Sequence, residues 1–356
     1  MTSDANLSKH VRIVKVLGKG EFGCVYLGES LQTGKAVAIK CFTQQRTLSK
    51  YGIEAVILRE VILLKKLSEL ADQNKSIQIA RLIELVPGSS QLPIQISMIL
   101  DFYPFTLRQT MTMTISYQQI QQYMFQMFRS LVYIHGAGIW HRDLKPENIM
   151  LNEQRTRCYL VDFGLGRMKS AFRIYTHHVG TCDYRPHELF YDMDRYDGAG
   201  LDIWSLGVIW LELLDPMHKC PWFAETELGM LKKMYSILGM PIEFPEFHRC
   251  LATREERLAD LCNNYYDTAE PNSYFDFAKE SHSNQYKQQD DAKNHEAQQA
   301  FAQQQLQILL KPMHIPEKHI ESLAQLFARI FDFNFRRRIT AIQILENYRK
   351  LFETPK

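Results

Sequence analysis

A glycine-rich stretch between two runs of β-branched residues limits most strongly what this chain can fold into. It contains Gly18, Gly20 and Gly23 and lies between the runs 11–17 and 24–29. Glycines let a backbone turn tightly and approach a phosphate closely. A dinucleotide-binding fold requires a helix directly after such a loop, so a strand at 24–29 disfavours that fold. Taken alone, the stretch fits either a phosphate-binding loop or a hairpin turn.

Further β-rich runs predict a small sheet in the first part of the chain. A third run at 36–42 follows after a glycine turn, and two more are expected near 80–85 and 94–100. Apolar residues at helical spacing predict one main helix at 52–67. We therefore expect a lobe at residues 1–103 with a five-stranded sheet and one main helix.

Beyond residue 103 the apolar pattern becomes helical. An apolar stripe runs from Ile120 to Ile134 and stops at Gly136. The run 201–214 is apolar nearly all round and should form a buried central helix. A β-rich part followed by a larger helical part predicts an α+β, bilobal chain with residues 104–356 as the second lobe.

The segment from about residue 243 to 311 departs from this pattern. Eight of the 21 residues between Gln285 and Gln305 are glutamine. Polar, low-complexity sequence is typical of a surface insertion or a solvated helix. We therefore treat 243–311 as an enlarged insert of the second lobe.

Composition and charge exclude several classes of protein. The chain has 42 Lys and Arg against 40 Asp and Glu, so its formal net charge of +2 gives no reason to expect a nucleic-acid or membrane partner. The apolar run 201–214 is shorter than the roughly 20 residues of a membrane span. The seven cysteines contain no Cys-x-x-Cys pair, which argues against a zinc site and a disulfide framework. We expect an intracellular protein, in the cytoplasm, the nucleus or both.

Polar residues suited to phosphate chemistry follow the glycine-rich stretch. Lys40 lies 17 residues beyond Gly23, where it can reach nucleotide phosphates. Asn148 and Asp162 carry oxygen atoms of the kind that bind Mg²⁺. Asp143 can accept the proton of an attacking hydroxyl group. Each residue alone is ordinary, but their order and spacing together point to phosphoryl transfer.

These segments resemble the signature motifs of eukaryotic protein kinases. The motifs are the glycine-rich loop, Val37–Lys40, His141–Asn148 and Asp162–Gly164. The resemblance extends from about residue 11 to 352, apart from the insert. It implies the bilobal protein kinase fold, with a small β-rich lobe and a large, mainly α-helical lobe. It also implies transfer of the γ-phosphate of ATP, with Mg²⁺, to a hydroxyl group of a protein substrate.

The resemblance assigns a role to each residue of the predicted active site. Lys40 contacts the α- and β-phosphates and pairs with Glu60, and Asp143 positions or deprotonates the acceptor hydroxyl. Asn148 and Asp162 hold Mg²⁺. The residues that the resemblance places around the nucleotide are Leu17, Gly18, Gly20, Gly23, Val25, Ala38, Lys40, Leu100, Asp101, Tyr103 and Met150.

Two further residues resemble those of serine/threonine kinases rather than tyrosine kinases. Lys145 matches the lysine that neutralises the γ-phosphate, and Thr181 matches the threonine that bonds the catalytic aspartate. The substrates implied are therefore serine and threonine hydroxyls of proteins.

The helix ending in Leu58-Arg59-Glu60-Val61 is similar to the cyclin-contacting helix of cyclin-dependent kinases. Ile53, Val56 and Leu58 would then face a cyclin-like activating subunit. Thr176 matches the threonine that receives an activating phosphate from an upstream kinase. Arg59, Arg142 and Arg167 match the three arginines that would clamp this phosphate.

The end of the activation segment departs from the family pattern. His187 stands where the family has the proline of Ala-Pro-Glu, whereas Glu188 is kept and would pair with Arg338. Asp202 matches the aspartate that holds the catalytic loop. Gly180-Thr181 resembles kinases that are not directed to proline and Arg185 resembles those that are, so the sequence leaves this preference open.

Other departures bear on regulation. Glu21 and Phe22 stand where cyclin-dependent kinases carry the Thr-Tyr pair that receives inhibitory phosphates, which excludes that inhibition here. A mitogen-activated-kinase-like enzyme is one alternative, although the Thr-x-Tyr switch reads Thr176-His177-His178. A pseudokinase scaffold is the other alternative, and only the altered Pro186-His187-Glu188 favours it.

Overall fold

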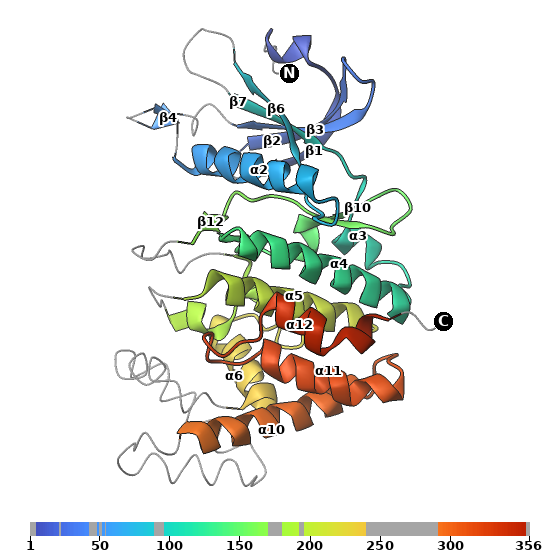
Figure 1. The fold of residues 1–356 in the computed structure, drawn as a ribbon, viewed down its shortest axis with the longest axis vertical. Coiled ribbons are helices and arrows are strands. Elements are labelled where there is room, and N and C mark those ends of the chain that lie inside the picture. Colours follow the sequence, from blue (N-terminus) through green and yellow to red (C-terminus); the bar gives the residue numbers. More distant parts are fainter. Residues whose placement is uncertain are drawn as a thin grey trace. The chain divides into compact units, whose positions relative to one another are not determined.

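Figure 1 shows the computed structural model, which describes residues 5–20, 23–42, 48–49, 52–53, 55–88, 96–169, 180–191, 196–239 and 291–353. The chain divides into two compact units. The first unit comprises residues 1–113, 129–141 and 146–169, and the second comprises 114–128, 142–145 and 170–356. This division does not follow the expected lobe boundary after residue 103, which stays a prediction.

The first unit is built on the predicted five-stranded antiparallel sheet. Its strands are β1 (Val11–Gly20), β2 (Gly23–Ser30), β3 (Ala36–Phe42), β6 (Leu82–Pro87) and β7 (Ile96–Asp101). They lie in the order β1-β2-β3-β7-β6. A 3₁₀ turn, η1 (Leu7–Lys9), precedes the sheet, and Leu7 packs with Val37 and Ile39 in the core on one of its faces.

The helix of this unit differs from its predicted bounds of 52–67. Gly52 and Ile53 form the short strand β5 (Gly52–Ile53), which pairs with β4 (Leu48–Ser49). The helix α2 (Ala55–Gln73) begins three residues later than predicted and continues beyond Leu67, because the apolar face extends to the buried Ala71. The strand β5, paired with β4, therefore replaces the start of the helix that periodicity predicted.

Short strands complete the first unit. β10 (Ile149–Leu151) lies between β8 (Phe105–Thr106) and β11 (Cys158–Leu160), and β9 (Ile139–Trp140) pairs with β12 (Arg167–Met168). The connecting turns are α3 (Leu107–Thr110), which has a capping box at Thr106, and the 3₁₀ turn η2 (Pro146–Asn148).

Helix α4 (Tyr117–Gly136) contributes residues to both units. It ends at Gly136, as predicted, and every residue of its predicted apolar stripe is buried. The stripe comprises Ile120, Met124, Met127, Leu131 and Ile134. Helical periodicity therefore identified this element correctly.

The second unit is helical around α5 (Gly198–Leu214), which is buried along nearly its whole length, as expected from its sequence. Asp197 caps the helix by accepting hydrogen bonds from the N–H groups of Ala199 and Gly200. The other elements are α6 (Glu227–Leu238), α10 (Asp291–Leu310), α11 (Glu317–Ile330), α12 (Ala341–Asn347) and the 3₁₀ turns η3 (Cys182–Tyr184), η4 (His187–Tyr191) and η5 (Arg349–Phe352).

The last part of the insert is not solely a solvated segment. Helix α10 packs against α6 and α11 (Figure 1), and Leu306 and Leu310 are fully buried. Gln299 donates to the carbonyl oxygen of Ala328 at 3.1 Å and to Oδ2 of Asp332 at 3.3 Å. The expectation of a surface insertion or a solvated helix is therefore wrong for 291–310. Residues 243–290 lie outside the described part of the chain.

Within the described ranges, we find no helix whose length and apolar character would let it cross a membrane.

Candidate active site

A lysine and two carboxylates meet in the first unit. Lys40 of β3 places its Nζ 2.6 Å from Oε1 of Glu60, on α2, and 3.0 Å from Oδ1 of Asp162. The side chains of Lys40 and Glu60 are 13% and 2% exposed, whereas that of Asp162 is 50% exposed. The two carboxylates therefore hold the ammonium group in a fixed place, and Asp162 keeps a face open to solvent.

Lys40 and Asp162 each stabilise the charged form of the other. Burial alone would lower the pKa of Lys40, but the charges of Glu60 and Asp162 raise it above its usual value. Burial alone would raise the pKa of Asp162, but the charge and hydrogen bond of Lys40 bring it below its usual value. At neutral pH the group therefore presents an ammonium and an ionised, partly exposed carboxylate.

The backbone at Asp162 has an unusual conformation. Asp162 has φ +60°, in the left-handed region that few residues other than glycine occupy. A side chain at Gly164 would place its Cβ 3.2 Å from Oδ1 of Asp162, so glycine keeps this approach open. The N–H of Val161 donates to the carbonyl oxygen of Asn148 at 3.0 Å, which brings the two predicted metal ligands of this unit together. Strained backbone of this kind concentrates at functional sites.

The register of the sheet gathers the predicted nucleotide residues on one face. Val25 lies opposite Lys40, and Ala38 lies opposite both Leu27 and Leu100. Directly opposed residues in antiparallel strands share a face, and this face is the reverse of the one that carries Val37 and Ile39. The structure therefore places Val25, Ala38, Lys40 and Leu100 together.

The glycine-rich loop needs glycine at one position above all. A Cβ at Gly23 would lie 2.0 Å from the carbonyl oxygen of Cys41. At Gly18 a Cβ would meet nothing within 4 Å. Gly20 ends β1. Leu17, three residues earlier in the same strand, is 43% exposed. The close approach of β2 to β3 explains Gly23, whereas Gly18 has no such packing requirement.

Two predicted nucleotide residues are engaged by neighbours in the first unit. The carboxylate of Asp101 accepts from Nε of Arg81 at 2.8 Å, and the ring of Tyr103 stacks on that of Tyr159 at 3.8 Å. Sequence reasoning missed Arg81 and Tyr159, and we find no local motif that marks either. Met150 lies in β10, opposite Tyr159.

The second unit contains a closed group of three polar side chains. Oδ1 of Asp143 accepts from the N–H of Thr181 at 3.0 Å and from its hydroxyl at 3.1 Å. Nζ of Lys145 lies 3.0 Å from Oδ2 of Asp143 and 3.0 Å from Oγ1 of Thr181. The carboxylate of Asp143 is therefore held through both oxygens.

The backbone before Asp143 is held from α5. Arg142 has φ +69°, and its N–H donates to Oδ1 of the fully buried Asp202 at 2.7 Å. The guanidinium of Arg142 is also fully buried and donates to the hydroxyl of Tyr196. Asp202 thus fixes the unusual backbone conformation that presents Asp143.

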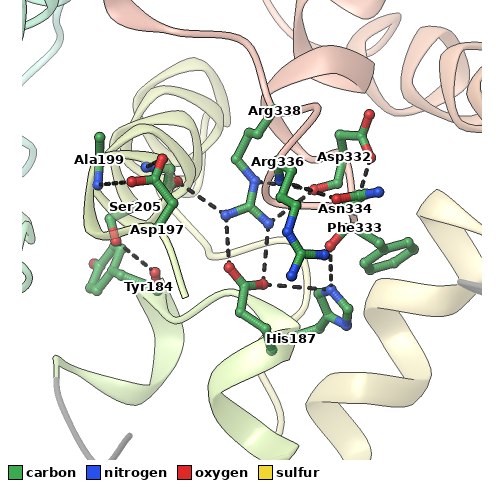
Figure 2. A network of polar contacts seen from close by, with 12 residues as sticks. Tyr184, His187, Asp197, Ala199, Ser205, Asp332, Phe333, Asn334, Arg336 and Arg338 are labelled. Atoms are coloured by element: carbon green, nitrogen blue, oxygen red, sulfur yellow. Dashed lines mark hydrogen bonds and ion pairs between the residues drawn. The ribbon is translucent and has the colours of Figure 1, made fainter. Parts of the chain in front are cut away.

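A buried ion pair anchors the end of the segment that carries Thr181. Nη1 and Nη2 of Arg338, which is labelled in Figure 2, donate to Oε1 and Oε2 of Glu188 at 2.9 and 3.1 Å. Both side chains are fully buried. Arg338 also donates to the carbonyl oxygens of Gly200 and Asp332. The predicted pair is therefore present and has the two-pronged geometry in which arginine binds carboxylates most strongly.

Comparison with known proteins agrees with this geometry. A family model described as "Protein kinase domain" matches residues 11–348. The chain belongs to the protein kinase family. Membership implies ATP as a substrate and the use of divalent metal ions.

Two curated relatives refine the class of kinase. The chain is 35% identical over 240 residues to "Cyclin-dependent kinase 7" of Caenorhabditis elegans. This alignment covers 66% of the chain and 68% of the relative. It is 34% identical over 241 residues to "Cyclin-dependent kinase 7" of Xenopus laevis, which covers 66% of this chain and 64% of that relative. The matched region thus spans about two thirds of each relative, and the enzyme class is protein serine/threonine kinase.

The predicted regulatory residues of the kinase are only partly described. Arg142 bonds Tyr196 and Arg167 donates from Nη1 to the carbonyl oxygen of Gly166, while Arg59 lies half-buried on α2. Thr176 lies outside the described residues, as do Glu21, Phe22, His177 and His178. The phosphate clamp therefore stays a prediction.

Helix α2 of the kinase exposes apolar side chains. Leu58 is 44% exposed and Ile62, one turn further on, is 58% exposed, while Val56 is partly buried. The side chain of Ile53 lies outside the described part of the structure. Sequence analysis did not single out Ile62, although its spacing of four residues from Leu58 would have identified it.

Proposed function

We propose that this chain is a cyclin-dependent-kinase-like enzyme that transfers the γ-phosphate of Mg-ATP to serine and threonine hydroxyls of proteins. The arrangement of Lys40, Glu60 and Asp162 carries the proposal, because it supplies a fixed cation for phosphates beside an ionised oxygen ligand. Pseudokinases usually lack one of the residues that act on ATP. All of those residues are present here, which disfavours a scaffold.

Asn148 and Asp162 would hold the magnesium ion. Their amide and carboxylate oxygens suit a hard cation, and the half-exposed side chain of Asp162 leaves room for a ligand. The ion held there would neutralise negative charge on the phosphates. Lys40 adds a positive charge beside the same phosphates, and Glu60 keeps its ammonium in place.

Asp143 would receive the proton of the acceptor hydroxyl. Thr181 donates its N–H and its hydroxyl to Oδ1, and Nζ of Lys145 lies 3.0 Å from Oδ2, so these contacts would hold the carboxylate in the orientation that accepts the proton. Lys145 then lies beside the hydroxyl that attacks, where its charge offsets that of the transferred phosphoryl group.

The conformation of Gly180 supports a preference for proline after the acceptor residue. Gly180 has φ +73°, and its carbonyl oxygen accepts from Nε and Nη2 of Arg185 at 2.9 and 2.7 Å. The backbone N–H of a substrate residue beside this carbonyl oxygen could not hydrogen-bond to it, because Arg185 already does so. Proline loses nothing there, because it has no backbone N–H. We therefore propose a proline-directed enzyme, for which the contact between Arg185 and the carbonyl oxygen of Gly180 is the supporting observation.

Regulation by a cyclin-like subunit and by phosphorylation of Thr176 completes the proposal. The exposed Leu58 and Ile62 offer an apolar contact on α2, and the named relatives are cyclin-dependent kinases. An upstream kinase would supply the phosphate on Thr176.

Transfer of labelled phosphate from Mg-ATP to an arrayed peptide library tests the function. We expect transfer by the wild type, with proline favoured after the acceptor, and a loss of about 10²–10⁴-fold in Asp143→Asn. Arg185→Ala should reduce the discrimination between proline and alanine at that position. Wild type that stays silent after a cyclin and a Thr176-directed kinase are supplied would favour the scaffold.

A further inference from the structure

His187 occupies the position at which the family pattern has proline. It begins η4 and is fully buried. Its Nε2 lies 2.8 Å from the carbonyl oxygen of Phe333, and its ring meets the ring of Phe333 edge-on at 4.5 Å between centroids (Figure 2). The side chain therefore ties the end of the activation segment to the loop that follows α11.

The geometry fixes the position of one proton on His187. A carbonyl oxygen only accepts hydrogen bonds, so Nε2 must carry the hydrogen and donate it. The same Nε2 lies 3.5 Å from Oε2 of Glu188, close enough for its positive N–H dipole to favour that carboxylate. Proline has neither this donor nor a ring that can meet Phe333 edge-on.

The histidine and the ion pair hold the same loop at neighbouring points. Arg338, which binds Glu188, also donates from Nε and Nη2 to the carbonyl oxygen of Asp332 at 3.1 and 2.9 Å. His187 binds the next carbonyl along, that of Phe333. His187 is thus bound to Phe333 directly, and Glu188 is bound to Asp332 through Arg338, so two neighbouring residues of the segment are held to the same loop.

This end of the segment is linked to the catalytic aspartate through a short, well-anchored stretch. Tyr184 donates from its hydroxyl to Oε2 of Glu212, and its carbonyl oxygen accepts from Ser205 at 2.8 Å. Three residues before it, Thr181 binds Oδ1 of Asp143. Because Tyr184 is anchored between them, a displacement of the backbone at His187 is expected to displace Thr181 as well.

We propose that His187 is a positioning residue for phosphoryl transfer, whose Nε2–H replaces the proline of the family by a hydrogen bond and so holds Thr181 against Asp143. This inference rests on the proposed function, since it concerns the same reaction. The histidine does not touch substrate or nucleotide; it acts through the backbone of residues 181–188.

A matched pair of substitutions separates the hydrogen bond from the packing. His187→Phe keeps an aromatic ring against Phe333 but removes the donor, whereas His187→Gln keeps an N–H donor without the ring. His319→Phe is the control, because His319 also makes one ring-nitrogen hydrogen bond in this unit, to the hydroxyl of Tyr117 at 2.9 Å. Each variant is measured for kcat with peptide, KM for ATP and melting temperature, using the activated enzyme.

If the loss of the His187 hydrogen bond frees Thr181 from Asp143, the reaction loses about one hydrogen bond in the transition state, which is worth about tenfold in rate. We expect kcat to fall by about that factor in His187→Phe, to stay within about threefold of wild type in His187→Gln, and to be unchanged in His319→Phe. KM for ATP should not change, because Lys40 and Asp162 belong to the first unit. His187→Phe with wild-type kcat, or His187→Gln as slow as His187→Phe, would overturn the inference.

Melting temperature keeps the test decisive if a variant is unstable. If His187→Phe does not fold, the inference then depends on His187→Gln, whose kcat must remain within about threefold of wild type. An inactive wild type would instead contradict the proposed function, and in that case the kcat comparison would not arise.

Discussion

Thr181 directs both its N–H and its hydroxyl to the same oxygen, Oδ1 of Asp143, at 3.0 and 3.1 Å. The two residues are 38 positions apart in the chain. Two donors to one oxygen restrict rotation of the carboxylate. The contact therefore couples the conformation of the activation segment to the orientation of the catalytic group.

Replacing the hydroxyl of Thr181 should slow phosphoryl transfer without unfolding the protein. In Thr181→Val the backbone N–H still reaches Asp143, but one of the two restraints is lost, and we expect kcat to fall about tenfold. Thr181→Ser keeps the hydroxyl and should stay near wild type. Steady-state kinetics on one peptide checks both variants, and equal rates in the two would contradict a role for the hydroxyl.

The ion pair between Lys40 and Asp162 should make the stability of the first unit depend on pH. The pKa of Asp162 is lower in the folded chain than its ordinary 3.8, so the pair stabilises the fold above pH 3.8 and this stabilisation is lost as pH falls through the lowered pKa. The pKa of Lys40 is raised above 10.5, so its contribution is full below pH 10.5 and is lost as pH rises through the raised pKa.

Thermal unfolding of wild type and Lys40→Met between pH 3 and pH 7 checks this dependence. At neutral pH we expect wild type to have a higher melting temperature than Lys40→Met. The difference in melting temperature between the two proteins should become smaller as the pH falls towards 3. Lys66→Met serves as the control, because Nζ of Lys66 donates to a carbonyl oxygen, that of Ala137 at 3.2 Å, rather than pairing with a carboxylate as Lys40 does. A constant difference between wild type and Lys40→Met across this range would contradict the assigned pair.

Removing Arg338 should destabilise the second unit severely. Arg338→Gln leaves the fully buried carboxylate of Glu188 without its cation, and breaking such a pair costs about 3–5 kcal/mol. Arg349→Gln is the control, since Arg349 pairs with Glu353 on the surface and is 81% exposed. Urea unfolding should show a large shift of the midpoint for the first variant and almost none for the second.

Helix α10 offers a direct test of whether the end of the insert belongs to the fold. Leu306 is fully buried, and truncating a buried leucine to alanine costs about 2–5 kcal/mol. Ile308, two residues later, is 53% exposed, so Ile308→Ala should change stability little. If the two variants unfold at the same urea concentration, α10 is not packed as described here.

Local sequence patterns predicted many of the elements well, because they depend on few neighbouring residues. The bounds of β3, the end of α4 at Gly136 and the buried character of α5 all follow from periodicity and glycine placement. The same reasoning failed where apolar residues are sparse. In α10 the glutamines conceal a narrow buried face around Leu306 and Leu310, which only the neighbouring helices complete.

Residue chemistry and motif spacing were enough to indicate a protein kinase and to predict roles for Lys40, Asp143 and Asp162, because each type of side chain suits one part of phosphoryl transfer. Packing across long stretches of chain determined the rest. Lys40 meets Asp162 across 122 residues and Glu188 meets Arg338 across 150. The capture of the Asp101 carboxylate by Arg81 and the tie between His187 and the carbonyl of Phe333 arise in the same way. Such contacts depend on where folded elements come to lie, and no short pattern in the chain encodes that.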